Sequence, residues 1–462
     1  MDPIKVILIF DVGKTNKKLL LFDEHYRIVF ENSTQLDETI DEDGDACEDI
    51  VTLSNWLQES FLEITADERY LISAVSVSAY GATLVHLDEY FKPVTPIYNY
   101  LKLYPEKLKK QFYGTYGGEL QISKQTASPV LGNLNSGLQL YRLKYEKPAI
   151  FNRIKYTLHL PQYISFLISG TVCSDITSIG CHTKLWDFTK QGYHEWVYNE
   201  GLDTRLAPIL NGDDVVQLFQ KGRQLPVGVG LHDSSAALIP YLANFNEPFI
   251  LLSTGTWCIS LNPFNESPLT ADELSKDCLC YLTYEGKPVK ASRLFAGYEH
   301  EAQTKRLAEY YQTENNYYKR IDFERDIITK IRLQQSQVGE SKEGILEKSG
   351  FGNRELSAFS SYEEAYHQLI TDLISQQVSA TKLVLNNCYV KRIFVDGGFS
   401  KNPIFMHLLA AAFPKIEVFA ASVAQATAMG AALAIHKHWN NKSLPGDIID
   451  LKFYSAIQDT GV

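Results

Sequence analysis

Residues 10–23 read FDVGKTNKKLLLFD and decide which fold the chain begins with. Gly13-Lys14-Thr15 matches the end of the phosphate loop of many NTPases, which has a glycine five positions earlier and opens a helix. Leu8 stands at that earlier position, and apolar runs lie on both sides of the turn and again at residues 27–30. Apolar runs joined by short polar turns predict an antiparallel meander of strands. The sequence therefore excludes a phosphate loop here.

The turn itself carries residues suited to an anion. A glycine lets backbone N–H groups approach an anion closely, and the hydroxyl of Thr15 adds a donor. Asp11 would repel phosphate unless a cation lay between them, which favours a nucleotide carried with Mg²⁺ that is held through water. The alternative is an ordinary turn with a solvated Lys-Thr-Asn-Lys-Lys tip, and this segment alone leaves both interpretations open.

Length and charge limit the class of protein. A chain of 462 residues is too long for one ordinary core, so two or three domains are expected. The net charge is −11 and no sustained basic run occurs. Nucleic acids and anionic membranes need clustered Lys and Arg, so neither is an expected partner. A small phosphorylated ligand needs only local donors and is not excluded.

Cysteine usage and hydropathy indicate a compartment. The seven cysteines are scattered, and the spacing of the one close pair, Cys278 and Cys280, suits neither a zinc knuckle nor a thioredoxin-like site. Buried free thiols in a reducing compartment are therefore expected. No signal sequence and no run of eighteen apolar residues is found, so we expect a soluble, cytoplasmic protein.

A second glycine turn lies about half a chain after the first. Residues 247–261 again read as strand, small-residue turn and strand, with Gly255 and Thr256 at the turn. Two similar halves, each offering one phosphate-binding hairpin, would form a cleft. We therefore expect two α/β domains, each starting with a meander, over residues 1–240 and 241–462 and meeting near 235–250.

A third glycine turn precedes a helix. A strand at 390–395 leads into Asp-Gly-Gly-Phe-Ser-Lys-Asn-Pro, and residues 404–413 follow with helical periodicity. Ser400 or Asn402 can cap this helix, and Pro403 suits its first turn. Bare backbone at Gly397 and Gly398 could accept a planar ring or a phosphate. The alternative is a common strand-to-helix connection. A long amphipathic helix is predicted upstream, over 362–386.

The segment before the second hairpin contains a candidate base. Residues 226–238 run from a short strand through His-Asp-Ser-Ser into a small-residue helix. Asp and Ser are common helix caps, and a lone histidine is more often structural. However, a carboxylate at this place, Asp233, could face a cleft and accept a proton.

The motifs DVGKT, GLHDSSAAL, STGTW and VDGGFSKNP, in this order, resemble those of the FGGY carbohydrate kinases over nearly the whole chain. That family has two ribonuclease-H-like, actin-type domains that close over ATP and a sugar. The form of the second and third motifs is most similar to the rhamnulokinase and fuculokinase branch. The resemblance implies an ATP- and Mg²⁺-dependent enzyme that phosphorylates a ketose or deoxyketose hydroxyl.

The resemblance also implies roles for individual residues. Asp233 matches the catalytic base, Asp11 the carboxylate near Mg²⁺, and His232 a sugar contact. The remaining matches are the first phosphate hairpin (Gly13, Lys14, Thr15, Asn16, Lys17 and Lys18), the second hairpin (Gly255 and Thr256) and the adenosine turn (Gly397, Gly398 and Asn402).

One departure concerns the sugar. The stretch VSVSAYGATLVHLD at 75–88 matches the region where this branch reads Gly-Val-Asp, so Gly81 and Thr83 are the expected sugar contacts. Thr83 replaces a carboxylate by a hydroxyl and loses a charge-assisted bond to the sugar. Further contacts are expected near residues 284–303, where only Gln303 is a candidate.

Other functions are weighed against this one. A xylulokinase-like enzyme, a non-catalytic sugar- and ATP-binding regulator, and an actin-like nucleotide switch share the fold. A switch has no use for a carboxylate beside an alcohol, and a metal-dependent hydrolase lacks paired His/Asp ligand spacing. The expected partners are a sugar and ATP, and a homodimer is left open.

Overall fold

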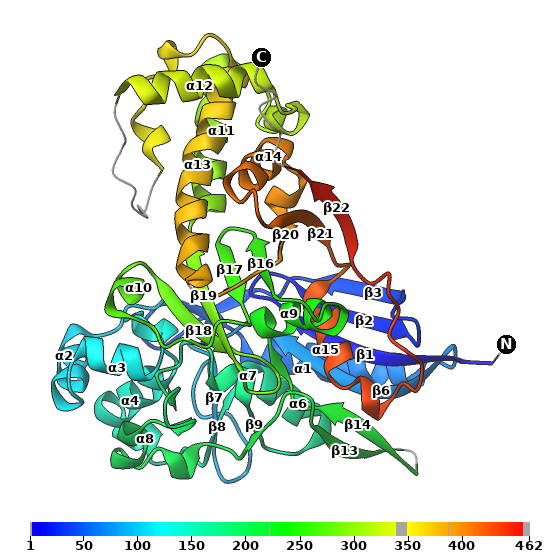
Figure 1. The fold of residues 1–462 in the computed structure, drawn as a ribbon. Coiled ribbons are helices and arrows are strands. Elements are labelled where there is room, and N and C mark those ends of the chain that lie inside the picture. The colour runs from blue at the N-terminus through cyan, green and yellow to red at the C-terminus, as the bar shows by residue number, and fades with distance from the viewer. Residues whose placement is uncertain (1, 221, 339–348, 387, 456–462) are drawn as a thin grey trace.

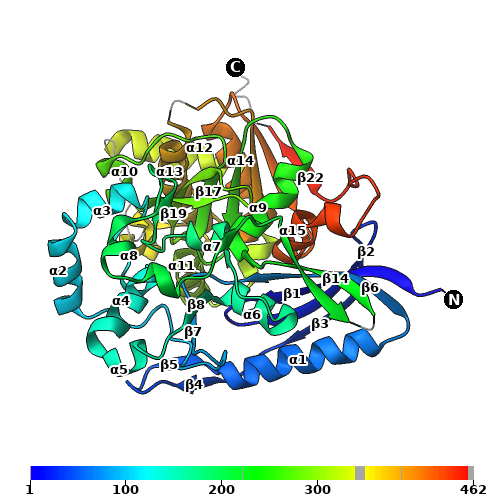
Figure 2. The same cartoon turned by 90° about the horizontal axis from the view of Figure 1, so that it is seen from below.

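Two mixed β-sheets form the frame of the molecule (Figures 1 and 2). The structure is a computed structural model that describes residues 2–220, 222–338, 349–386 and 388–455. The first sheet has the order β13-β14-β6-β1-β2-β3, with β15 paired to β6, and the second has the order β18-β19-β17-β16-β20-β21-β22.

The strands of the first sheet are β1 (Ile4–Val12), β2 (Lys17–Asp23), β3 (Ile28–Thr34), β6 (Tyr70–Ala79), β13 (Val215–Gln220), β14 (Arg223–Gly228) and β15 (Leu231–His232). Those of the second are β16 (Phe249–Thr254), β17 (Cys258–Asn262), β18 (Cys278–Leu282), β19 (Pro288–Leu294), β20 (Arg392–Gly397), β21 (Glu417–Ser422) and β22 (Asp450–Tyr454). Each sheet contains an antiparallel meander, β1-β2-β3 in one and β16-β17-β19-β18 in the other. The predicted fold class is confirmed, and Gly13 is followed by a strand rather than a helix.

Helices cover both sheets. In the first half they are α1 (Ile50–Ala66), α2 (Glu106–Thr115), α3 (Glu119–Gln125), α4 (Gly137–Glu146), α5 (Pro148–Phe151), α6 (Leu160–Ser169), α7 (Ile176–Ile179), α8 (Glu195–Asn199) and α9 (Asp233–Asn244). In the second half they are α10 (Ala271–Ser275), α11 (Ala296–Tyr311), α12 (Arg325–Val338), α13 (Tyr362–Leu385), α14 (Pro403–Ala412) and α15 (Ala426–Ala434).

Small two-stranded sheets complete the structure. They pair β4 (Glu38–Ile40) with β5 (Ala46–Glu48), β7 (Leu84–Leu87) with β8 (Tyr156–His159), β9 (Ser174–Asp175) with β12 (Ile209–Leu210), and β10 (Trp186–Asp187) with β11 (Gly192–Tyr193). The helices α2, α3, α4 and α8 gather at one side of the first sheet, and the long α13 stands upright beside α11 and α14 (Figure 1).

Helices α9 and α15 join the two halves. They cross in close contact, and α15 also packs on β1 and β6 of the first sheet although it belongs to the second half of the chain. A Cβ built on Gly430 of α15 would lie 1.9 Å from the carbonyl oxygen of Ala236 in α9. The helix backbones therefore touch, and no larger residue fits at this crossing.

The predicted division at residues 240 and 241 falls inside α9. Because α9 packs against elements of both halves, we keep this boundary as a proposal rather than a measured limit. One apolar cluster brings together side chains of β1, β2, α9 and α15 with those of β16, β18 and β19, so the halves share a core.

The cysteines behave as predicted: all seven are free, and only Cys388 is not fully buried. Among the described helices, none combines the length and the apolar character that crossing a bilayer requires.

Candidate active site

The candidate site is built at one edge of the first sheet. Strands β6 and β15 run parallel to each other, and β1 runs parallel to β6, so their carboxyl ends meet at the same edge. The register places Asp11 opposite Ser78 and His232 opposite Ala79. Two motifs more than two hundred residues apart in the sequence therefore come together, with Asp233 following as the first residue of α9.

Asp11 is held from the other half of the molecule. The hydroxyl of Thr427, in α15, donates to its Oδ2 at 2.8 Å. Burial, with a smaller contribution from the negative charge of Asp233, raises the pKa of Asp11 to about 6 against the opposing effect of the Thr427 hydrogen bond. Two ionised carboxylates close together in a buried site repel each other. A divalent cation bound between them would offset that repulsion.

Asp233 combines burial of its carboxyl with an opening to solvent. Its side chain is 36% exposed, and its Oδ1 accepts a hydrogen bond from the backbone N–H of Ser234 at 2.6 Å. Loss of hydration raises its pKa to about 6. The carboxylate is thus ionised at neutral pH and has a higher proton affinity than an ordinary aspartate, as a general base requires.

His232 lies beneath Asp233 and is buried. Its Nε2 is 3.2 Å from the Sγ of Cys181 and 3.4 Å from Oδ1 of Asp233, while its Nδ1 has no hydrogen-bond partner among the residues that the structure describes. Its ring stacks on Tyr281 with centroids 5.8 Å apart. Burial lowers the pKa of His232 to about 4, so the ring is neutral at pH 7.

The loop after β6 forms the wall behind this histidine. A Cβ on Gly81 would lie 2.4 Å from Cδ2 and Nε2 of His232, so only glycine permits this approach. Thr83 is 1% exposed, and its carbonyl accepts a hydrogen bond from the N–H of Leu160. Gly81 therefore contacts the histidine directly, whereas the hydroxyl of Thr83 lies inside the protein.

The first hairpin has the tight turn that the sequence predicts. The N–H of Gly13 donates to the carbonyl of Asn16 at 2.9 Å, and both Thr15 and Asn16 are exposed.

The three lysines of this hairpin differ in their partners and in their burial. Lys14 pairs with Glu38 and Lys18 donates to Gln425 of the linker before α15, whereas Lys17 is buried in an ion pair with Glu48 at 2.7 Å. The ammonium group of Lys17 therefore anchors the hairpin from behind.

The second hairpin and the third glycine turn are neighbours. Strands β16 and β20 run parallel, with Thr254 opposite Gly397. The hydroxyl of Thr254 donates to the carbonyl of Asp396 and accepts from the N–H of Phe399. Gly255 and Thr256 are exposed at the tip of the hairpin. One side chain thus fixes both turns in relation to each other.

The third glycine turn is fixed by backbone packing and by hydrogen bonds of Asn402. Gly397 has a φ of +92°, and a Cβ there would lie 2.1 Å from the carbonyl oxygen of Thr254, so glycine is required; Gly398 follows it. Asn402 caps α14 by accepting from the N–H of Phe405, and its amide donates to the hydroxyl of Tyr366. Asn402 shapes the turn through these bonds.

Sequence comparison identifies the family. Residues 6–239 match the N-terminal domain of the FGGY family of carbohydrate kinases, and residues 246–443 match the FGGY carbohydrate kinase C-terminal domain. The chain belongs to the FGGY family of carbohydrate kinases.

Curated relatives of this FGGY chain include two rhamnulokinases. That of Halalkalibacterium halodurans is 26% identical over 270 residues, which are 54% of this chain and 52% of the relative. That of Mannheimia succiniciproducens is 23% identical over 262 residues, with the same coverage. The match spans about half the length of these relatives.

Solved structures show the same fold over nearly the whole chain. A carbohydrate kinase from Novosphingobium aromaticivorans has a TM-score of 0.77 at 22% identity, covering 99% of this chain and 95% of that chain. A xylulose kinase from Lactobacillus acidophilus also has a TM-score of 0.77, at 17% identity, covering 98% and 94%. Plasmodium falciparum glycerol kinase with ADP has a TM-score of 0.75 at 16% identity, covering 94% and 90%. At these identities the likeness establishes the two-domain fold.

Sequence reasoning missed residues around His232 of this FGGY chain. Cys181 contacts it, and the guanidinium of Arg293, in β19, exerts its charge on Cys181 and pairs with Asp277 at 2.7 Å. Arg293 also lies 5.3 Å from the ring centroid of Trp257 in the second hairpin. It therefore links that hairpin to the surroundings of Asp233. The available signal was that Arg293 lies within the region, residues 284–303, where further contacts were expected.

Gln303 is the weaker candidate from the same region. Its amide donates to Oε1 of Glu299 within α11 at 3.2 Å, and a Cβ on Gly352 would lie 3.2 Å from it. It contacts the segment 349–353 rather than the residues around Asp233.

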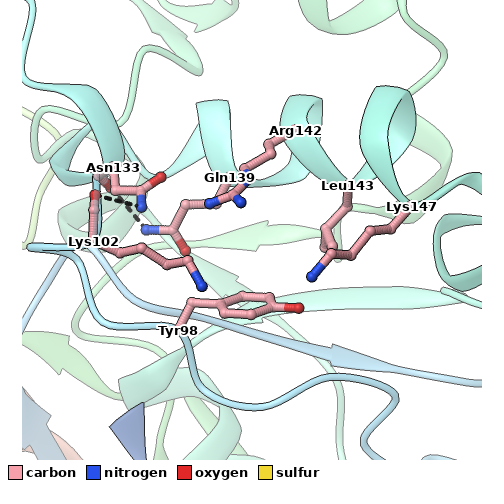
Figure 3. Close-up of a pocket in the computed structure, with 7 residues that line it drawn as sticks. All are labelled: Tyr98, Lys102, Asn133, Gln139, Arg142, Leu143 and Lys147. Carbon is pink, nitrogen blue, oxygen red and sulfur yellow. Dashed lines mark hydrogen bonds between the residues drawn. The ribbon is translucent and has the colours of Figure 1, made fainter. Parts of the chain in front are cut away.

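A small cavity of the FGGY chain has none of these residues in its lining (Figure 3). Its lining is Tyr98, Lys102, Asn133, Gln139, Arg142, Leu143 and Lys147. Its cationic groups are paired: Lys102 with Asp41, and both Arg142 and Lys147 with Asp43. These ion pairs neutralise the positive charges that line the cavity. They hold the turn between β4 and β5 in place and leave no site for an anion.

Proposed function

We propose that this chain catalyses ATP-dependent phosphorylation of a hydroxyl group on a ketose or deoxyketose, with a sugar like L-rhamnulose or L-fuculose favoured. The observation that carries the proposal is the position of Asp233: partly exposed, with a pKa raised to about 6, at the start of α9 and close enough to Asp11 to raise its pKa.

The chemistry follows from this arrangement. The sugar oxygen attacks the γ-phosphorus of ATP, the bond from that phosphorus to the bridging oxygen breaks, and ADP leaves. The proton of the attacking hydroxyl passes to a carboxylate oxygen of Asp233. Little covalent chemistry is required of the protein, which has to align the groups and neutralise charge. The N-terminal end of α9 adds a favourable field for the negative charge that gathers there.

The two glycine hairpins and the turn at Gly397 are the proposed binding elements for ATP. The N–H groups of residues 14–16 and of Thr256 would hold phosphate oxygens, while those of Gly13 and Gly255 close their hairpins. The bare backbone at 397–398 would lie against adenosine. Asp11 would hold Mg²⁺ through water, since its raised pKa is lowered by a nearby cation. When bound, the metal neutralises charge on the phosphates.

His232 is the proposed sugar contact. Its unpartnered Nδ1 is buried, and a buried polar atom without a partner is destabilising unless a ligand or water supplies one. A sugar hydroxyl would satisfy one ring nitrogen. Gly81 belongs to the same subsite because it fixes the ring. We retain Thr83 only as a wall residue of this subsite.

The choice of sugar rests on the two rhamnulokinase relatives and on the form of the His-Asp-Ser segment. The alternatives are a xylulokinase-like enzyme and a sugar-binding regulator without turnover. The burial of Thr83 favours neither, because the hydroxyl it offers in place of a carboxylate is not presented to solvent.

The test is sugar-dependent release of ADP. Purified protein with Mg-ATP is assayed against L-rhamnulose, L-fuculose, D-xylulose, glycerol and gluconate, with a sugar-free reaction and Asp233→Asn as controls. The largest kcat/KM is expected for one of the 6-deoxyketoses. Preference for D-xylulose would move the chain to the xylulokinase-like alternative. Binding of sugar without any ADP release would establish the regulator.

A further inference from the structure

Three metal-ligating side chains meet beneath Asp233. Cys181, His182 and His232 each offer one ligand atom, and these atoms all lie within 4.8 Å of one another. All three side chains are buried. Neither Cys181 nor His182 has a part in the phosphoryl transfer proposed above. We propose that this cluster, completed by Asp233, is an inhibitory binding site for Zn²⁺.

The distances suit tetrahedral zinc. With Zn–S of about 2.3 Å and Zn–N of about 2.0–2.1 Å, neighbouring ligand atoms in a tetrahedron lie about 3.3–3.6 Å apart. Nε2 of His232 is 3.2 Å from Sγ of Cys181 and 3.4 Å from Oδ1 of Asp233. Nε2 of His232 therefore stands at nearly the required spacing from two other ligand atoms, and the remaining ligand atoms have to move closer together for zinc to bind.

The second histidine is oriented for the role. Its Nδ1 donates to the carbonyl oxygen of Leu134 at 2.8 Å, which leaves Nε2 as the nitrogen with the free lone pair. A histidine ligand whose other nitrogen donates to a carbonyl is the usual arrangement in zinc sites. The ring of His182 stands at 88° to that of His232, with centroids 6.4 Å apart.

Electrostatics decide which ion fits. The site has one thiol, two neutral imidazoles and one carboxylate, a mixture of S, N and O atoms that suits Zn²⁺ better than Mg²⁺, which prefers oxygen. Binding converts the thiol of Cys181 to a thiolate and releases one proton to the solvent, without any change of oxidation state. Burial and the negative charge of Asp233 raise the pKa of this thiol well above its usual value and the charge of Arg293 lowers it by less, so the metal itself has to stabilise the thiolate.

The consequence for activity rests on the proposed function. Zinc would bind Nε2 of His232 and the carboxylate of Asp233, so it would remove the proposed base and block the place where the sugar hydroxyl meets that carboxylate. Inhibition is then expected to be competitive with sugar and unaffected by the concentration of Mg-ATP.

The test uses Co²⁺ as a spectroscopic substitute for zinc, on the whole protein under anaerobic conditions. One equivalent of Co²⁺ is expected to give a thiolate-to-metal charge-transfer band, and Zn²⁺ to abolish it. Cys181→Ser should lose the band, and Cys173→Ser, which removes another buried thiol of the same half, should keep it. His182→Gln should weaken Co²⁺ binding at least tenfold, which tests the site if Cys181→Ser does not fold.

The outcomes separate this inference from the kinase proposal, because the spectrum needs no turnover. A missing band in the unaltered protein, or an unchanged band in Cys181→Ser, would overturn the zinc site whatever sugars are phosphorylated. A band that depends on Cys181 in a protein that phosphorylates no sugar would establish the site and refute the kinase proposal. Non-competitive inhibition would overturn the role of Asp233 as a ligand.

Discussion

At the scale of single residues, burial gives Asp233 and His232 different roles because it shifts their pKa values in opposite directions. The same burial that raises the pKa of the carboxyl to about 6 lowers that of the imidazole to about 4, because each environment disfavours the charged form. The carboxylate is therefore the stronger base of the two, and the histidine a neutral hydrogen-bonding group.

Replacing Asp233 by Asn tests this division. Asn keeps the size and one acceptor oxygen but cannot take the proton, so kcat should fall by about 10²–10⁴ while nucleotide binding and folding persist. His232→Ala is the comparison, and should raise the sugar KM more than it lowers kcat. Steady-state kinetics and nucleotide binding by calorimetry measure both. The assignment of the base is wrong if Asp233→Asn retains more than about a tenth of kcat while His232→Ala abolishes turnover.

The raised pKa of Asp11 should make the stability of the folded protein depend on pH. Its pKa is raised from 3.8 to about 6, so between these values the folded state binds a proton that the unfolded state does not. The stability of the protein therefore falls as pH rises through this window, and Asp11→Asn escapes that loss. With a chelator present, Asp11→Asn should have a higher Tm than the unaltered protein at pH 8, and a smaller advantage at pH 5, which lies inside this window. A lower Tm at pH 8 would contradict the raised pKa.

The resemblance of the motifs predicted which residues share the candidate site, but not which of their side chains are already paired within the protein. The sequence brings Asp11, His232 and Asp233 into one site through the motifs that contain them. It does not show that Lys17 forms a buried ion pair with Glu48, nor that the side-chain amide of Asn402 donates a hydrogen bond to Tyr366. Such pairings depend on residues distant in sequence, which a local pattern cannot supply.

At the scale of elements, the loop after β6 packs tightly against the residue that precedes α9, and no additional side-chain atom fits between them. Gly81→Ala would place a methyl group 2.4 Å from the ring of His232, and overpacking of this kind costs about 1–3 kcal/mol. The cost should disappear in the His232→Ala background, because the ring is then absent. Denaturant unfolding of the two single variants and the double variant measures this coupling.

The control is Gly114→Ala, since nothing lies within 4 Å of a Cβ at Gly114. It should cost less than Gly81→Ala in both backgrounds. Additive costs for Gly81→Ala and His232→Ala would show that the loop and the ring do not press on each other.

Elements were predicted where one period dominates the sequence. The meander and the helix predicted over 362–386 were found as β1-β2-β3 and α13, and β1, β2 and α13 bury most of their apolar side chains. The helices between β7 and α9 were not predicted. They are short and pack around aromatic side chains such as Phe112, Tyr141 and Trp196, and their arrangement depends on contacts among themselves.

At the scale of the whole molecule, the crossing of α9 and α15 connects Asp233, the proposed base, to Asp11, the carboxylate proposed to hold Mg²⁺. Gly430→Ala would bring a Cβ against the backbone of Ala236, where nothing can rotate away, so the helices must separate. Since α9 carries Asp233 and Thr427 of α15 holds Asp11, kcat should fall roughly tenfold and stability by about 1–3 kcal/mol. Gly446→Ala, with open space around its Cβ, should change neither. Unaltered kcat and Tm in Gly430→Ala would show that the crossing is not coupled to the site.

The same crossing has a consequence for synthesis on the ribosome. The apolar cluster beneath β1 and β2 includes Ala428, Ala431, Ala432 and Ile435, which are translated long after α9 is complete. At 5–20 residues per second, the interval between Asn244 and Ala434 lasts roughly 10–40 s. During that time the nascent first half has its strands and α9 but lacks the helix that covers them. Its apolar face remains exposed to solvent until α15 is translated and packs against it.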